Sequence, residues 1–122
     1  LPDEDPEMSE LKKLMGELSS FRMLSVNMKT NEGLTGELRT AVAEYTYRNE
    51  FSDLLRLQKG EEDIYIKILE KDETVREAIL MMSSDNDFFV IDLRGNISME
   101  HFTKLAEGGY LNELTTLSDF NF

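Results

Sequence analysis

The residue best suited to acid–base chemistry is the single histidine, His101, which lies beside Glu100 in the first turn of a predicted helix. A general base needs a substrate proton about 3 Å away and a partner that orients the base. The sequence supplies neither, and it has no Gly-x-Ser-x-Gly motif to provide a nucleophile. We therefore interpret His101 as an exposed or helix-capping residue.

The acidic turn Asp85-Asn86-Asp87 is similar to the start of a calcium-binding loop. Such a loop needs further oxygen ligands, a central glycine and a glutamate at its twelfth position. Phe88 and Phe89 stand where those ligands are needed, so we interpret the segment as a hairpin turn.

The acidic groups at 61–63 and 72–73 are the third candidate, because two carboxylates about 5–10 Å apart can hydrolyse glycosides. Both groups flank predicted turns, where carboxylates are usually solvated. We expect no catalytic residue, no cofactor site and no metal site, and therefore no enzyme.

The composition is that of one acidic domain of 122 residues with a net charge of -12. This charge repels nucleic-acid phosphates and anionic lipid, so we expect neither as a partner. The absence of cysteine excludes disulfides, thiolate metal sites and cysteine nucleophiles. No apolar run approaches the ~18 residues that a membrane-spanning helix needs.

Periodicity predicts the elements that must position these side chains. Apolar residues at helical spacing indicate helices over 6–18, about 35–45 and from Ser98, with Pro6 in the first turn and Thr35 as a cap. Alternation predicts strands at 21–29, 51–59 and 64–69. The segment 74–83 is apolar on both faces in its middle and is expected to be a central strand, and 88–94 completes the series before Gly95-Asn96. The order α-β-α-β-β-β-β-α predicts an α+β fold of two layers. It has a mainly antiparallel sheet of about five strands, with the helices packed on one face.

We divide the chain into an acidic flexible N-terminal tether (1–7), a single α+β domain (8–117) and a C-terminal tail (118–122). The sequence begins with Leu1 rather than Met, so we expect it to be a trimmed or processed form. The strand at 21–29 is expected at an edge of the sheet, where a homodimer can form by strand addition.

The polar side of the predicted sheet offers the best binding surface. If the registers agree, it collects Ser25, Asn27, Lys29, Tyr65, Lys67, Arg76, Asp92 and Arg94. Tyrosine and arginine are enriched in binding hot spots, so we expect a partner-binding face at Tyr65, Lys67, Arg76 and Arg94. The open alternative is the ordinary solvated face of an antiparallel sheet.

The segment 88–98, followed by Phe102-Thr103-Lys104-Leu105, resembles the end of the domain of unknown function 4252 family, found mainly in Bacteroidetes. The segments 64–69 and 77–83 also resemble it, and 21–25 fits more loosely; the resemblance covers about residues 8–117. It is a fold pattern without a catalytic motif. It implies a small exported protein, often lipid-anchored through a cysteine that precedes this sequence, in the periplasm or at the outer membrane.

The expected function is therefore that of a non-enzymatic cell-envelope protein, a binding or accessory module that acts through contacts with a protein partner. Two alternatives stay open. The resemblance implies a regulator or sensor of envelope sigma and anti-sigma signalling, since relatives are thought to be encoded near such factors. A pocket that holds polar groups with shifted pKa values would instead indicate a small-molecule binder or a weak hydrolase.

Overall fold

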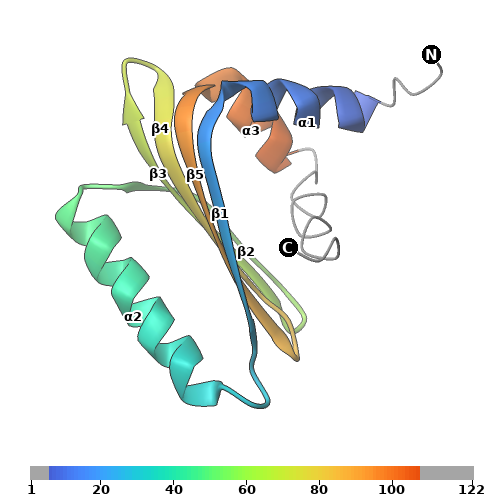
Figure 1. Cartoon of the computed structure of the whole chain (residues 1–122), viewed down its shortest axis with the longest axis vertical. Coiled ribbons are helices and arrows are strands. Elements are labelled where there is room, and N and C mark those ends of the chain that lie inside the picture. Colours follow the sequence, from blue (N-terminus) through green and yellow to red (C-terminus); the bar gives the residue numbers. More distant parts are fainter. Residues whose placement is uncertain (1–5, 108–122) are drawn as a thin grey trace.

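The computed structural model describes residues 6–107, which follow the order α-β-α-β-β-β-β-α (Figure 1). The helices are α1 (Pro6–Glu17), α2 (Glu32–Arg48) and α3 (Met99–Glu107). The strands are β1 (Leu18–Asn27), β2 (Ser52–Lys59), β3 (Glu62–Lys71), β4 (Thr74–Ser83) and β5 (Asp87–Ser98). This confirms the α+β class, the five-stranded antiparallel sheet and the predicted order of elements. The predicted tail and most of the predicted tether lie outside the described residues.

The sheet has the order β1-β5-β4-β3-β2, and every neighbouring pair is antiparallel. Hairpins join β2 to β5 in succession, and Gly60, with φ +62°, makes the first turn possible. β1 pairs with β5 alone and so forms one edge of the sheet, as predicted for 21–29. Among the described residues, no helix is long and apolar enough to cross a membrane.

One face of the sheet carries the main apolar core beneath α1 and α3. Ile66, Leu80 and Ile91 are fully buried and pair across β3, β4 and β5. Leu14 of α1 and Phe102 of α3 pack against the same cluster. Because each such side chain contributes roughly 1.5–3 kcal/mol when buried, this face serves the stability of the fold.

The helix α2 lies on the opposite face of the sheet (Figure 1), so the prediction that the helices pack on one face is wrong for α2. Its residues Leu38 and Val42 pack against a second apolar cluster of Val26, Met81 and Phe88. The physical reason lies in β4, which is apolar on both faces in its middle and therefore needs a cover on each side.

Several element ends also differ from the prediction; β1, for example, spans Leu18–Asn27 instead of 21–29. α2 begins at Glu32 after Asn31, so Thr35 does not cap the helix but lies buried in its first turns. β5 continues through Gly95 to Ser98 instead of ending there. Gly95 is required at this point because a Cβ atom would overlap the backbone carbonyl oxygen of Glu17.

Candidate functional site

The four residues predicted to form one binding face lie at three places. Tyr65 and Lys67 of β3 lie together and contact the same carboxylate on β2, whereas Arg94 of β5 lies in a charged network beneath α2. Arg76 donates a hydrogen bond to Asn96 and joins neither group. The predicted face is therefore divided.

The other predicted members of that face are also divided. Asp92 belongs to the network of Arg94. Ser25 and Asn27 alternate along β1 with Val26, which packs beneath α2, so they lie on the other face of the sheet. Lys29 follows the end of β1 and is exposed.

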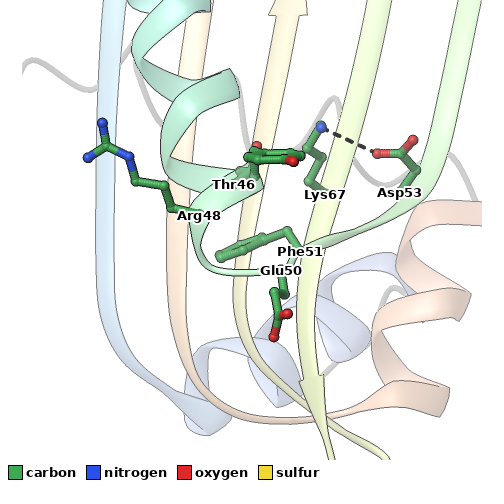
Figure 2. A pocket seen from close by; sticks show the side chains of 7 residues that line it. Thr46, Arg48, Glu50, Phe51, Asp53 and Lys67 are labelled. Carbon is green, nitrogen blue, oxygen red and sulfur yellow. Dashed lines mark ion pairs between the residues drawn. The ribbon is translucent and has the colours of Figure 1, made fainter.

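Lys67 lines a hollow of about 660 Å³ at the C-terminal end of α2 (Figure 2), and its Nζ lies over the ring of Tyr65. Its lining residues are Thr46, Tyr47, Arg48, Glu50, Phe51, Asp53 and Lys67. Figure 2 shows Lys67 and Asp53 paired on the β2–β3 side of the hollow, with Phe51 below the end of the helix. Two residues of the last helical turn project into solvent, with Tyr47 86 % exposed and the Arg48 side chain 77 % exposed.

The end of α2 is fixed by hydrogen bonds, which determines where Tyr47 points. The hydroxyl of the buried Thr46 donates to the Val42 carbonyl at 2.8 Å, so Thr46 occupies the inward position of the last turn. The backbone N–H of Phe51 donates to the Thr46 carbonyl at 2.9 Å. Glu50, at φ +57°, reverses the chain into β2. Tyr47, next to Thr46, is therefore held outward.

Beside the strand side of the hollow, the ring of Tyr65 contacts two cationic side chains. Arg56 lies 5.4 Å and Lys67 5.2 Å from the ring centroid, distances at which a cation is attracted to the ring. The Tyr65 hydroxyl donates to Asp53 Oδ1 at 2.9 Å, and Lys67 Nζ lies 3.5 Å from the same oxygen. These contacts keep two cations close to one aromatic ring at the surface.

A second cavity, of about 230 Å³, lies between α2 and the sheet. It is lined by Arg22, Leu38, Ala41, Val42, Tyr45, Glu77, Ile79, Asp92 and Arg94. Asp92 Oδ2 lies 2.6 Å from Nη2 of Arg22 and 3.3 Å from Nε of Arg94. Glu77 is only 6 % exposed and accepts a 2.7 Å hydrogen bond from the Tyr45 hydroxyl.

Glu77 and Asp92 form a carboxyl pair with opposite pKa shifts. Burial and the hydrogen bond with Asp92 raise the pKa of Glu77. Burial alone would raise the pKa of Asp92, but hydrogen bonds from Glu77 and Arg22 outweigh it and lower that pKa. Glu77 therefore holds a proton more readily than an ordinary glutamate, and Asp92 holds one less readily than an ordinary aspartate. Glu77 Oε2 and Asp92 Oδ1 are buried without a hydrogen-bond partner outside this pair, and Glu77 Oε2 lies 3.4 Å from Nε of Arg94.

The residues Glu77 and Tyr45 were absent from the predicted site. A signal for Glu77 exists in the sequence, because a glutamate stands within a strand whose next residues are Ala-Ile-Leu-Met-Met. A charged residue in a central strand needs a partner when buried. The partner could not be identified, since Asp92 and Tyr45 reach Glu77 only through the register and the placement of α2.

The side chain of His101 in α3 contacts Glu17 at the end of α1. Its Nδ1 lies 2.5 Å from Glu17 Oε1, and Glu17 Oε2 accepts a 2.8 Å hydrogen bond from the Ser98 backbone N–H. The His101 backbone N–H donates to Ser98 Oγ at 3.4 Å, which is the capping contact expected of Ser98. The burial of Glu17 alone would raise its pKa, but the bonds from His101 and Ser98 lower it.

The acidic segments also occupy structural positions. The segment 85–87 forms the turn between β4 and β5, with Ser84 N–H bonded to the Asp87 carbonyl at 2.9 Å, which confirms the hairpin interpretation. The segments 61–63 and 72–73 lie at the β2–β3 and β3–β4 turns. Within residues 6–107, no three acidic or histidine side chains are grouped as metal ligands.

Comparison with known proteins gives a family and no further relative. The family model described as a domain of unknown function, DUF4252, matches residues 1–105. No curated protein and no solved structure matches the chain.

Proposed function

This chain belongs to the DUF4252 family, and we propose that it is a non-enzymatic binding module of the cell envelope that acts through contact with a protein partner. The observation that carries the proposal is the pair Tyr47 and Arg48, exposed on a fixed helix end beside the hollow of Figure 2.

The exposure of Tyr47 is unusual for a large aromatic side chain. A ring that is 86 % exposed contributes little to the stability of the domain. Tyrosine and arginine are the residue types that dominate binding hot spots, where they fill or border pockets on the partner. Because hydrogen bonds already fix the end of α2, binding there causes little further loss of backbone conformational entropy.

The chemistry of the hollow favours a partner that inserts a side chain between the helix end and the strands. Phe51 gives the hollow an apolar side. Arg48 and Lys67 contribute positive charges to it, and Glu50 and Asp53 contribute negative charges. Mixed charges at a rim select orientation and partner more than they raise affinity.

The test is site-specific photo-crosslinking in cells that produce the full precursor. A photoreactive residue at position 47 should give a discrete adduct with a second polypeptide. The same residue at position 100, exposed on α3, is the matched control and should not. Arg48→Ala should weaken the adduct. Identical adducts at both positions, or none at 47, would contradict the proposal, and an adduct of two copies of this chain would identify a homodimer.

We also propose that the precursor is exported and lipid-anchored, as the family resemblance implies. Fractionation of the same cells, with antibody labelling before and after permeabilisation, tests the location. Labelling of intact cells indicates surface display, labelling only after outer-membrane permeabilisation indicates the periplasm, and recovery in the cytoplasmic fraction would contradict the proposal.

A further inference from the structure

We propose that the cavity between α2 and the sheet binds a small amphipathic organic monocarboxylate. In this proposal Arg22 and Arg94 bind the carboxylate, and Leu38, Val42 and Ile79 contact the apolar portion. This site is separate from the hollow at Tyr47, and the inference does not depend on the function proposed for that hollow.

Asp92 contacts both guanidinium groups, and Glu77 contacts one of them. Asp92 Oδ2 accepts from Arg22 Nη2 at 2.6 Å and lies 3.3 Å from Arg94 Nε, which also lies 3.4 Å from Glu77 Oε2. Within the described part of the chain, the terminal nitrogens of Arg94 and the second terminal nitrogen of Arg22 donate no hydrogen bond. The two side chains are 45 % and 63 % exposed, so these N–H groups are accessible. A guanidinium with free paired N–H groups matches the geometry of a carboxylate.

The floor of the cavity holds a polar atom with an incomplete hydrogen-bond shell. Glu77 is more than nine-tenths buried, and its Oε2, which lies 3.4 Å from Nε of Arg94, has no hydrogen-bond partner outside its contact with Asp92. A buried polar atom is costly to leave without a full set of hydrogen bonds. Such a group at the base of a cavity is a feature of ligand sites rather than of closed cores.

The exposure of the charged groups favours an anion. The side chains of Arg22 and Arg94 are 63 % and 45 % exposed, whereas those of Asp92 and Glu77 are only 15 % and 8 % exposed. A carboxylate that enters from solvent therefore meets guanidinium N–H donors first, whereas an amine would meet two positive charges.

The apolar wall and the volume limit the rest of the ligand. Leu38, Val42 and Ile79 line the cavity together with the charged groups. At about 30 Å³ for each water-sized group, a cavity of about 230 Å³ accommodates roughly eight heavy atoms. Hexanoate has that size and carries one carboxylate, so it is a suitable probe.

The test is a titration of the folded protein with hexanoate, followed by backbone amide NMR shifts at constant ionic strength. Hexanoate should give saturable shifts confined to β1, β4, β5 and α2, the elements that line the cavity, whereas hexanol and hexylammonium should give none that saturate. Arg22→Gln and Arg94→Gln should each raise the Kd about tenfold or more, the effect of losing one charge-assisted hydrogen bond. Arg56→Gln, at an exposed arginine outside the cavity, is the matched control and should not change the Kd.

A second variant covers the case in which loss of an arginine disturbs folding. Ala41 lines the cavity and has no polar side-chain atom, so Ala41→Phe should fill the cavity and abolish hexanoate shifts while the charged groups remain.

A short peptide ending in leucine, with a free or an amidated C-terminus, distinguishes a chain terminus from a free acid as the source of the carboxylate. Equal binding of hexylammonium and hexanoate, or unchanged Kd values in the arginine variants and Ala41→Phe, would overturn the proposal. Tyr47→Ala should leave hexanoate binding intact, which separates this test from that of the hollow.

Discussion

The hydroxyl of Tyr45 in α2 donates a 2.7 Å hydrogen bond to Oε1 of Glu77 in β4, and this bond joins the helix to the centre of the sheet. The Tyr45 ring also packs against Phe51, with ring centroids 5.6 Å apart. Thr35 and Thr46 are the buried residues of α2, and its apolar contacts with the sheet come from partly buried side chains. Among the described residues, the bond to Glu77 is the one side-chain hydrogen bond between α2 and the sheet.

Tyr45→Phe should weaken that attachment while it keeps the ring. We expect a loss of about 1–2 kcal/mol in the free energy of unfolding, because the bond is removed and a buried carboxyl oxygen loses its donor. Urea denaturation measures the loss, and hydrogen exchange should show faster opening of α2. Tyr47→Phe, at a hydroxyl exposed on the same helix, is the control. Equal stability of the two variants would show that the bond does not hold the helix.

Glu77→Gln should change how stability depends on pH. The pKa of Glu77 is raised above 4.5, so above that pH the folded state holds more protons than the unfolded state, and stability falls as pH rises toward the folded pKa. The side-chain amide introduced by the substitution would keep a donor toward Asp92 and an acceptor for Tyr45 without titrating. The variant should therefore gain stability relative to the wild type as pH rises from 4.5.

Denaturation of both proteins at a series of pH values from about 4.5 to about 8 measures this difference. Asp92 does not mask it, because its pKa is lowered below 3.8 and its stabilisation is lost only as pH falls through that lower range. Glu70→Gln, at an exposed glutamate of β3, controls for the substitution itself. A difference between Glu77→Gln and wild type that stays constant with pH would contradict the raised pKa of Glu77.

The sequence was sufficient for the fold wherever a local pattern determines structure. An apolar segment between two turns placed β4 at 74–83, in agreement with the observed strand, and Pro6 was correctly placed in the first turn of α1. It was insufficient where two distant segments determine the outcome. The face chosen by α2 depends on the second apolar cluster around Phe88, and that cluster forms only once β1 pairs with β5.

The residues of the candidate site were likewise predictable within one strand and not across strands. Lys67 and Tyr65 could be placed on one face from their spacing in one strand, and they do lie together. Arg76 departs from the pattern because the β4 register shifts between Val75 and Glu77. A shift of this kind leaves no clear mark in the sequence, so the separation of Arg76 from Arg94 could not be predicted.

Gly95→Ala should destabilise the fold although the position lies in a strand. The added Cβ would overlap the carbonyl oxygen of Glu17 and approach Leu18 Cα to 3.0 Å, where α1 passes into β1. Since both neighbours are backbone, the strand must shift, and we expect a loss of about 1–3 kcal/mol. Thermal and urea unfolding measure it. Gly36→Ala, at a helical glycine with open space around it, is the control and should be neutral or stabilising.

Glu17→Ala should loosen the junction of α1, β5 and α3. Glu17 accepts the Ser98 N–H at 2.8 Å and lies 2.5 Å from His101 Nδ1, so its loss removes the carboxylate that is bonded to the start of α3. We expect a cost of about 1–2 kcal/mol near neutral pH, as for the loss of a helix cap. Because the pKa of Glu17 is lowered below 4.5, the cost should diminish as pH falls through that range.

A double-mutant cycle with His101→Gln separates the two contacts of Glu17. If the His101 contact contributes, the cost of Glu17→Ala should be smaller in the His101→Gln background, and the remainder belongs to the Ser98 N–H. Glu100→Ala, which removes an exposed carboxylate of the same helix turn, is the control for a general electrostatic effect. An equal cost for Glu17→Ala and Glu100→Ala would show that Glu17 acts only through its charge near the helix start, without the specific bonds to Ser98 and His101.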